Sequence, residues 1–320
     1  MINQALNGLL AMTKKKKQQK LATKFENRIC VFLDILGFKD HLDQAATDPK
    51  YVRRISGAFA CVNDHLRERI PGLKSRRLSQ YSDCVTISYR IDEPSSAYYL
   101  LSELQQLQIA LAGRGFLVRG GVTVGPLVHD AGQLFGPAQV RAYVLESKQA
   151  VYPRILVDER IIEMARKFPA PHHNADDEEG YLRGILCEDF DKRLYLGYTT
   201  VKSTVDVAGA DPDDYAGYMA RILKIVEEGL KSTDPCILAK MLWLYGKYLE
   251  AREDIKPEFY DTHFPNTLLP VAQKAYQAVL AHVMKNQHDK AKCALPKSLV
   301  SVLKSSKTNR SRRTTGAHTQ

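Results

Sequence analysis

The sequence contains no apolar run that approaches the ~20 residues needed to cross a membrane. Its N-terminus (MINQALNGLLAMTKKKKQQK) places a short apolar stretch before the lysines, which is the reverse of a secretory signal. The six cysteines are scattered and form no CxxC pair, so a zinc site built on cysteines is not expected. These absences predict a cytoplasmic protein in a reducing compartment, without a membrane span.

Acidic residues are nearly absent from the two ends of the chain. Residues 1–24 carry six lysines and no acid, and residues 285–320 carry nine Lys or Arg and a single acid. Since the whole chain has a net charge of +10, the intervening residues 25–284 have a net charge of −4. We predict basic disordered tails at 1–24 and 287–320. The mildly acidic remainder argues against stable nucleic-acid binding, although the tails leave docking on nucleic acid or a membrane as an alternative.

Apolar periodicity divides the middle of the chain into strands and helices. Strands are predicted at 28–37, on both sides of Ser82-Asp83, at 115–130 and at 152–158, and helices at 38–69 (broken near Asp48-Pro49), 95–113 and 136–150. The order β-α-β-β-α-β-α-β predicts an α+β fold, a ferredoxin-like sandwich in which helices pack on an antiparallel sheet.

The predicted sandwich occupies residues 25–205, and a helical extension follows it at 206–286. Within the sandwich we expect a polar surface loop at 171–180, followed by two more strands at 182–190 and 193–201. The extension contains three amphipathic segments, which predict helices at 212–231, 236–252 and 268–286.

Two aspartates occupy the ends of predicted strands. Asp34 lies where the first strand emerges from its apolar run, and Asp83 lies at the turn of the hairpin. In a β-α-β-β unit these strands can be neighbours, so both carboxylates would converge at one edge of the sheet. Adjacent carboxylates raise one pKa unless a cation lies between them, and their oxygens suit Mg²⁺ or Mn²⁺. The alternative is that each Asp only caps its own turn.

Four segments, in this order along the chain, resemble the class III nucleotidyl cyclase family, and this resemblance favours a metal site. They are FLDILGF, YSDCVTIS, FLVRGGVTVGPLVHD and FGPAQVRAYVLES, and they cover about residues 28–150. The resemblance implies a catalytic domain in which Asp34, Asp83 and the Ile35 carbonyl hold two Mg²⁺ or Mn²⁺ ions per site. The substrate it implies is a nucleoside triphosphate.

The same resemblance assigns residues to the phosphates. It implies that the turn Leu36-Gly37-Phe38 cradles phosphate oxygens with its amides. Arg119 matches a strand arginine that contacts the triphosphate, whereas a surface strand residue is the plainer interpretation. Family members complete the site across an interface, and one chain here carries both aspartates, so the resemblance implies a symmetric homodimer.

Four positions depart from the purine cyclases. Ser79 and Gln133 stand where the adenine-selecting Lys and Asp would be, so we expect them to contact the base of a different nucleotide. Val140 and Val144 stand where the transition-state Asn and Arg would be. Either the protein is a weak catalyst or other groups replace them, and Arg141 is the candidate that we place in the catalytic set. Tyr143 and Arg154 are further candidates for that role.

A closer resemblance is to the pyrimidine cyclases of bacterial antiphage defence, the Pycsar systems. FLDILGF, the SDC hairpin, RGGVTVG, FGPAQVRAYVLES with YPRI, and MLWLYGKYLEA carry it. It implies that the protein makes cyclic UMP or cyclic CMP, which activates a separate effector protein. The alternatives are a purine cyclase with unusual selector residues and an inactive nucleotide sensor that has kept the fold.

Several other residues are given ordinary interpretations. His172-His173 and the acids that follow them could bind a metal, but a solvated loop is favoured because no apolar residue flanks them. Trp243 and Tyr245 are expected in the core or in a dimer contact. His129 could contact substrate, which we regard as the less favoured interpretation.

Overall fold

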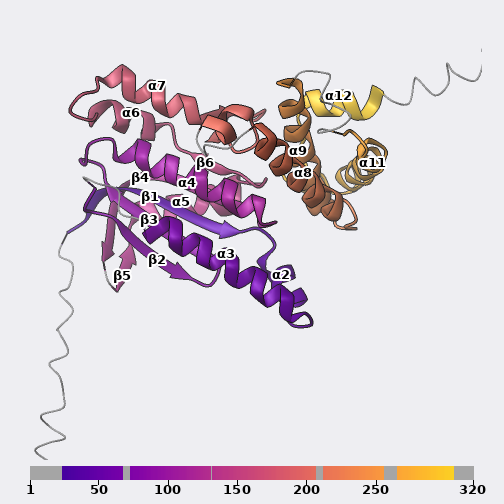
Figure 1. The fold of residues 1–320 in the computed structure, drawn as a ribbon, viewed down its shortest axis with the longest axis horizontal. Coiled ribbons are helices and arrows are strands. Elements are labelled where there is room, and N and C mark those ends of the chain that lie inside the picture. The colour runs from indigo at the N-terminus through magenta and orange to yellow at the C-terminus, as the bar shows by residue number, and fades with distance from the viewer. Residues whose placement is uncertain (1–23, 68–72, 131, 207–211, 256–264, 306–320) are drawn as a thin grey trace, which may run out of the picture.

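An eight-stranded sheet organises the computed structural model, which describes residues 24–67, 73–130, 132–206, 212–255 and 265–305. The strands are β1 Glu26–Ile35, β2 Arg77–Tyr81, β3 Cys84–Arg90, β4 Val118–Asp130, β5 Gln133–Phe135, β6 Ile155–Val157, β7 Leu186–Glu188 and β8 Leu194–Leu196. The helices are α2 Phe38–Ala45, α3 Pro49–Arg67, α4 Ser96–Gly113, α5 Pro137–Val144, α6 Arg160–Lys167, α7 Ala175–Ile185, α8 Pro212–Gly229, α9 Pro235–Glu253, α11 Leu269–Lys285 and α12 Lys297–Ser305. Figure 1 shows the sheet and its helices at one end and α8, α9, α11 and α12 at the other.

The sheet is mixed rather than purely antiparallel as predicted. Strands β2, β3, β1 and β4 lie in that order and are all antiparallel, which is the arrangement expected of a β-α-β-β-α-β unit. Beyond them β4 pairs in parallel with β6. Parallel neighbours need a crossover connection, and α5 with the short π-helical turn η1 (Leu145–Gln149) supplies it.

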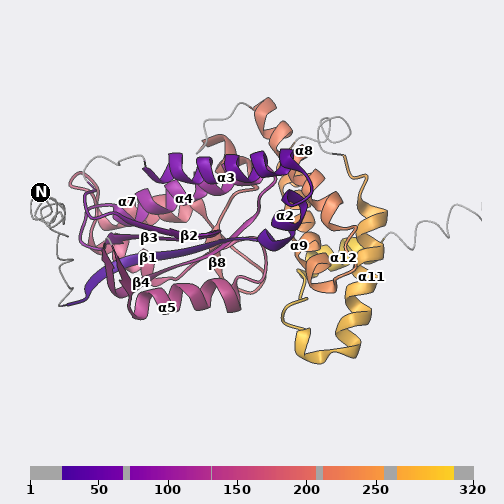
Figure 2. The same ribbon diagram turned by 90° about the horizontal axis from the view of Figure 1, so that it is seen from below.

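Alternation along β1 separates the two faces of the sheet. Ile29, Val31 and Leu33 are buried in a cluster with residues of α3 and α4. Cys30 is buried on the opposite face in a smaller cluster with residues of α5, and Phe32 packs against that cluster. Figure 2 shows α3 and α4 on one side of the sheet and α5 on the other. By the same alternation Asp34 belongs to the α5 face.

The polar loop predicted at 171–180 is wrong for most of that range, because α7 begins at Ala175. Asn174 accepts hydrogen bonds from the backbone N–H groups of Asp176 and Asp177, and Asp177 in turn accepts from the Asn174 N–H. Such a capping box with acids in the first turn stabilises a helix N-terminus. The helix also includes residues 182–185, the start of the strand predicted at 182–190, so the observed strand is only the short β7.

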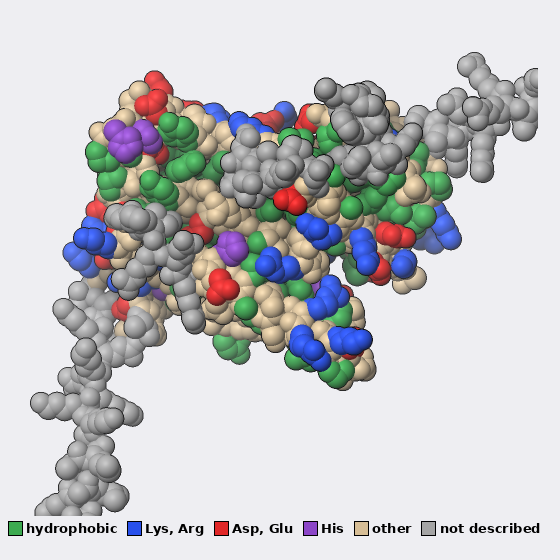
Figure 3. All heavy atoms as spheres, viewed as in Figure 1, with side chains coloured by type: hydrophobic (Ala, Val, Ile, Leu, Met, Phe, Trp, Pro, Cys, Tyr) green, Lys and Arg blue, Asp and Glu red, His purple; other side chains and the backbone are tan. Residues whose placement is uncertain are grey.

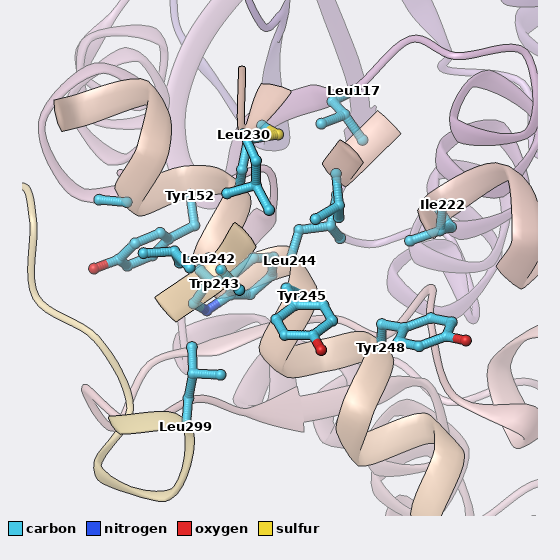
Figure 4. Close-up of a cluster of buried hydrophobic side chains, with 14 of the residues drawn as sticks. Leu117, Tyr152, Ile222, Leu230, Leu242, Trp243, Leu244, Tyr245, Tyr248 and Leu299 are labelled. Atoms are coloured by element: carbon cyan, nitrogen blue, oxygen red, sulfur yellow. The ribbon is translucent and has the colours of Figure 1, made fainter. Parts of the chain in front are cut away.

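The C-terminal extension forms its three predicted helices, and its core is shared with the sheet. The shared cluster includes Trp243 and Tyr245, both fully buried, together with Leu117 and Tyr152 from the sheet region (Figure 4). Trp243 and Tyr245 are therefore core residues. The boundary predicted at 205/206 does not separate two independent cores.

Part of the predicted C-terminal tail is ordered. Residues 297–305 form α12, in which Leu299 and Leu303 are buried against the shared cluster. The prediction of disorder is wrong for this part, because a short apolar stripe in a basic segment is enough to pack a helix on an existing core. Residues 287–296 of that tail are also described: Gln287–Asp289 form a 3-10 helical turn and Cys293 is buried. Residues 1–23 and 306–320 lie outside the described residues.

The surface of the described chain carries both signs of charge. On the face shown in Figure 3, Lys and Arg side chains are interspersed with Asp and Glu side chains. Among the helices that the structure describes, none combines the length and the apolar character needed to cross a bilayer.

Candidate active site

The C-terminal end of β1 places Asp34 next to Arg119. The two residues are cross-strand partners on β1 and β4, and Arg119 Nη2 lies 3.3 Å from Asp34 Oδ2. Both side chains are about one-fifth exposed, which keeps the pair accessible at the end of the sheet. The register of β1 and β4 therefore brings Arg119, the residue expected to contact the triphosphate, beside this aspartate.

The hairpin between β2 and β3 brings a second carboxylate to the same place. Ser82 adopts a left-handed conformation (φ 54°) and Asp83 follows it at the turn. Ligand atoms of Asp34, Asp83 and Cys84 all lie within 4.8 Å of one another. The Cys84 thiol donates a hydrogen bond to Asp34 Oδ1 at 3.6 Å. The two predicted carboxylates therefore converge, and they do so with a thiol beside them.

The electrostatics of this group favour a cation. Burial, reinforced by hydrogen bonding and repulsion from Asp83, raises the pKa of Asp34, and Arg119 only partly offsets this. Burial and the two neighbouring carboxylates raise the pKa of Cys84 to about 12. The hard donors of this group are the carboxylate oxygens of Asp34 and Asp83, and the Cys84 thiol is a soft donor beside them. Carboxylate oxygens suit Mg²⁺ or Mn²⁺.

A third acid, Glu146, reaches the site from the helical side. Its Oε1 lies 2.6 Å from Arg119 Nη2, and its side chain is only 3% exposed. Burial raises the pKa of Glu146, and the charge of Arg119 opposes that rise. Arg119 is thus held between Asp34 and Glu146, which fixes the direction of its guanidinium.

A glycine on β4 permits the approach of Glu146. A Cβ atom on Gly121 would lie 2.5 Å from the carbonyl oxygen of Ala142 and 2.5 Å from Cβ of Leu145. The α5 helix and the π-helical turn η1 therefore pack directly on the backbone of β4. Single π-helical turns within helices occur frequently at functional sites, and this one sets the register that carries Glu146 inward.

The turn after β1 exposes backbone donors near Asp34. Gly37 is the N-cap of α2 with φ +72°, a conformation that favours glycine. The Gly37 carbonyl oxygen accepts hydrogen bonds from the Asp40 and His41 N–H groups. The N–H groups at the very start of α2 have no preceding helical carbonyl to pair with. Phe38 is buried and meets Phe59 edge-on with ring centroids 5.8 Å apart, so the turn is anchored from below.

The neighbours of this turn are packed into the two cores. The Ile35 side chain is buried against α3 and α4, while Leu36 packs on the C-terminal cluster. The Leu36 N–H donates to the Leu117 carbonyl oxygen at 2.8 Å. The Ile35 carbonyl, expected as a main-chain metal ligand, belongs to the last residue of β1, which directly follows Asp34.

Ser79 lies on β2 in a buried polar network. Its hydroxyl is 3.0 Å from His129 Nε2, and His129 Nδ1 is 2.8 Å from the Ser88 hydroxyl, which also accepts from Arg28 Nε. Burial, aided by Arg28, lowers the pKa of His129 to about 4, so its imidazole is neutral at pH 7. Gln133 lies on β5, three positions after the β4 residue Asp130, whose carboxylate accepts a hydrogen bond from the Gln133 N–H.

Arg141 does not join Asp34 and Asp83. Its guanidinium lies 3.1 Å from Asp158, the residue that follows β6, and its side chain is 55% exposed. The helical phase that brings Glu146 to Arg119 turns Arg141 toward this different strand end. On the same helix Tyr143 meets Phe32 edge-on with centroids 5.5 Å apart, and Val140 is 63% exposed.

Arg154 has a structural partner set. It is fully buried and ion-paired with Asp189 and Asp191, and Asp189 also accepts from Trp243 Nε1 at 2.8 Å. Lys247 Nζ lies 3.3 Å from the same Asp189. The network connects the loop before β6 to α9, so Arg154 fastens the extension to the sheet.

The histidine and acid cluster at 172–179 is also accounted for by ordinary contacts. Arg166 pairs with Asp176 and Glu179, and His173 Nδ1 lies 2.9 Å from the buried Glu178. Within the described residues these acids serve to cap and brace α7.

Sequence reasoning missed Glu146 and Lys240. Glu146 is the one acid within the helical segment 136–150, and its position among apolar residues was the available signal. Lys240 lies on α9, and its pKa is lowered by burial and by the charge of Arg119. The signal for Lys240 was a lysine inside the apolar run ILAKMLWL.

Comparisons with known proteins identify only a distant likeness. No protein-family model matches the chain, and no curated protein matches it. One solved structure that matches is that of a bacterial light-regulated adenylyl cyclase, with 13% sequence identity and a TM-score of 0.32. The match covers 51% of this chain and 56% of that chain, so this chain spans about half the length of the matched structure. A likeness at this level carries no argument about activity.

Proposed function

We propose that the chain is a nucleotidyl cyclase that converts UTP or CTP to the 3′,5′-cyclic monophosphate and pyrophosphate. The observation that carries the proposal is the convergence of Asp34 and Asp83 at one end of the sheet, beside Arg119. The order of the motifs around these residues supports the cyclase family. The same motifs support the role of the product as a second messenger in antiphage defence.

The donor set fits divalent cations. Asp34 and Asp83 supply hard oxygen ligands at close range, and the raised pKa of Asp34 marks negative charge that a bound cation would neutralise. The Ile35 carbonyl is a further oxygen donor at the same strand end. Two Mg²⁺ or Mn²⁺ ions bound there would lower the pKa of an attacking hydroxyl and offset the charge of leaving pyrophosphate.

The chain's own residues orient the reaction. The 3′-hydroxyl of the nucleotide attacks its own α-phosphorus in line, one P–O bond forms, and the bond to pyrophosphate breaks. Arg119, aimed by Glu146, neutralises charge on the triphosphate, and the free amides at the start of α2 after Gly37 donate to its oxygens. The catalytic role expected for Arg141 stays a prediction.

The pyrimidine choice rests on the sequence resemblance and on the base-site candidates. Ser79 and Gln133 carry no charge, and the Ser79 hydroxyl is oriented by the neutral imidazole of His129. A neutral hydroxyl and amide pair offers both a donor and an acceptor to a pyrimidine edge.

An apolar stripe on α5 supports a homodimer. Val140, Tyr143 and Val144 are each at least one-third exposed, and Phe135 on the adjacent β5 is 48% exposed. A second copy of the chain would cover this stripe in a symmetric contact, as the resemblance implies. Sedimentation of wild type and Val140→Asp would test it, since a monomeric wild type at micromolar concentration contradicts the dimer.

Product analysis tests the proposed activity. The purified chain is incubated with a mixture of ATP, GTP, CTP and UTP and with Mn²⁺, and the products are identified by mass spectrometry. Cyclic UMP or cyclic CMP is expected, and Asp34→Asn and Asp83→Asn should each lower its formation at least about 100-fold. A cyclic purine product alone would contradict the pyrimidine assignment.

A catalytically inactive nucleotide sensor is the second candidate. The exposed Val140 and Val144 favour it, since neither supplies a polar group to a transition state. In that case the chain binds a nucleotide with Mn²⁺ and releases no pyrophosphate. Calorimetric binding without turnover would select this candidate. A separate effector protein is expected only for the active cyclase.

A further inference from the structure

A histidine near the end of β4 lies against β2 and β3. His129 Nε2 is 3.0 Å from the Ser79 hydroxyl of β2, and its Nδ1 is 2.8 Å from the Ser88 hydroxyl of β3. The register aligns Ser88 with Thr123 through Cys30, so His129, further along β4, reaches Ser88 only because the end of β4 turns back over the sheet. His129 and Ser88 are buried, whereas Ser79 is partly exposed. The three side chains therefore run in a line from the interior to the surface.

A buried arginine decides which ring nitrogen of His129 carries the proton. Arg28 Nε, which can only donate, lies 2.8 Å from the Ser88 hydroxyl oxygen. The Arg28 guanidinium is held in place by Glu26, 2.5 Å from Nη1, and by the carbonyl oxygen of Ser75. Among the residues that the structure describes, the Ser88 hydroxyl has one other partner, His129 Nδ1. A proton on Nδ1 would leave the Ser88 hydrogen without an acceptor in the interior, so the Ser88 hydroxyl donates to Nδ1.

The ring proton of His129 is consequently on Nε2, and it makes Ser79 a donor. Burial, aided by Arg28, lowers the pKa of His129 to about 4, so the ring is neutral at pH 7 and carries a single N–H. This N–H donates to the Ser79 oxygen. The hydrogen of the Ser79 hydroxyl then points away from the imidazole, and it meets no acceptor within the described part of the chain. Ser79 thus offers a hydrogen bond to a molecule that approaches the sheet.

Ser79 lies on the face of the sheet that carries Asp34. Ser79 pairs with Thr86, and Thr86 pairs with Phe32 of β1. Cross-strand partners share a face, and so do residues two apart on one strand, which places both Ser79 and Asp34 on the α5 face. The exposed stripe of α5, which would meet a second copy of the chain, is on the same side (Figure 2). A nucleotide bound on this face would therefore have Ser79 and the carboxylates on one surface.

We propose that His129 is a positioning residue of the base site, which together with Arg28 and Ser88 fixes the Ser79 hydroxyl as a hydrogen-bond donor toward the base of the substrate. The proposal rests on the proposed cyclase function for the presence of a nucleotide. Uracil presents O4 and cytosine presents N3 as an acceptor on the edge away from the ribose, so either pyrimidine can take this hydrogen. The Gln133 amide can rotate to offer a donor or an acceptor, so the fixed polarity of the site comes from Ser79.

The state of the imidazole is tested without a substrate. Nitrogen-15 NMR of the full chain, labelled at its histidines, distinguishes a protonated from an unprotonated ring nitrogen at pH 7, and His129→Phe identifies the signals of His129. We expect a protonated Nε2 and an unprotonated Nδ1. Ser88→Ala, which removes the donor to Nδ1, should abolish this preference, and the exposed His172→Phe should leave the His129 signals unchanged.

The role of Ser79 and His129 toward the base is tested by calorimetry with Mg²⁺. The ligands are 3′-deoxy-UTP and 3′-deoxy-CTP, which lack the attacking hydroxyl, and inorganic tripolyphosphate, which lacks a base. Ser79→Ala and His129→Phe should each weaken binding of the preferred nucleotide about tenfold, and the double variant should lose little more because both remove one hydrogen bond. Tripolyphosphate affinity should not change. Ser79→Thr keeps the hydroxyl and His129→Gln keeps an N–H donor, so both should retain most of the affinity, and His172→Phe is the control.

The outcomes separate the two proposals. A proton on Nδ1 of His129 overturns the positioning role, whether or not the wild type is a cyclase. Equal nucleotide affinity in wild type, Ser79→Ala and His129→Phe overturns it as well, as does an equal loss of nucleotide and tripolyphosphate affinity, which would show general damage to the fold. A wild type that forms no cyclic nucleotide but loses nucleotide affinity alone on these substitutions retains the base site and rejects the cyclase function.

Discussion

The Nη2 atom of Arg119 lies 2.6 Å from the Oε1 atom of Glu146, a carboxylate that is almost completely buried. Arg119 has a second acid within reach, Asp34, at 3.3 Å. The Arg119 guanidinium is therefore paired both with Asp34, which is proposed to bind metal, and with Glu146, which is buried. This sharing predicts how the site responds when Glu146 loses its charge.

Glu146→Gln should make the protein require more metal. Without the buried carboxylate, Arg119 pairs more strongly with Asp34 and competes with the cation for it. The Mn²⁺ concentration for half-maximal cyclisation should rise about tenfold, as for other outer partners of metal sites. Glu163→Gln, an exposed acid on α6, is the control and should behave as wild type. An unchanged Mn²⁺ dependence in Glu146→Gln would contradict this arrangement.

Asp34→Asn should stabilise the metal-free protein at neutral pH. Because burial and Asp83 raise the pKa of Asp34, folding favours its protonated form. That contribution is complete below the ordinary carboxyl pKa of about 3.9 and is lost as the pH rises through the raised value. Urea unfolding with EDTA at pH 7 should show a higher free energy of unfolding for Asp34→Asn than for wild type. The difference should vanish near pH 3.5, and added Mn²⁺ should stabilise only wild type.

The buried His129 predicts a loss of stability in acid. Its pKa is lowered to about 4, so folding favours the neutral imidazole. Its contribution is present above the unfolded value of about 6.5 and is lost as the pH falls toward 4, by up to about 3 kcal/mol. Between pH 7 and pH 4.5, wild type should therefore lose more unfolding free energy than His129→Gln. The exposed His172→Gln should follow wild type, and parallel curves for all three proteins would refute the assignment.

Asp189→Asn should weaken the interactions that hold the extension against the sheet. Asp189 is fully buried, accepts hydrogen bonds from Arg154 and Trp243 and forms an ion pair with Lys247, so loss of its charge leaves buried cations less compensated. We expect the free energy of unfolding to fall by about 3 kcal/mol. Asp92→Asn breaks an exposed pair with Arg90 and should cost less than about 1 kcal/mol. Chemical denaturation of both variants compares the two effects directly.

The strongly periodic parts of the fold were predictable from the sequence. The apolar run around Asp34, the helix 95–113 and the three helices of the extension correspond to β1, α4, α8, α9 and α11. Their period repeats over many residues, and the breaks at Gly37 and Asp48-Pro49 coincide with real ends. The convergence of Asp34 and Asp83 was also predictable from the sequence, because it depends on the order of the strands, which places β1 next to β3.

Features that depend on contacts distant in the sequence were not predictable. The parallel pairing of β4 with β6 requires knowing where the crossover packs, and Glu146 reaches Arg119 only because Gly121 lets η1 approach. The acids in the first turn of α7 resemble those of a solvated loop, and only the capping box with Asn174 shows that they begin a helix.

The packing of Leu36 and Leu117 into the cluster of α8 and α9 limits how the chain can be divided. A fragment that stops at residue 205 would leave both leucines facing water, together with the buried Tyr195 and Tyr198. The backbone hydrogen bond between these leucines, from the Leu36 N–H to the Leu117 carbonyl oxygen, would become more exposed to water on one side. Any shortened or chimeric version of the chain should therefore carry α8 and α9 with it, because Leu36 and Leu117, near the strand ends that bear Asp34 and Arg119, belong to or pack on the cluster that these helices help to build.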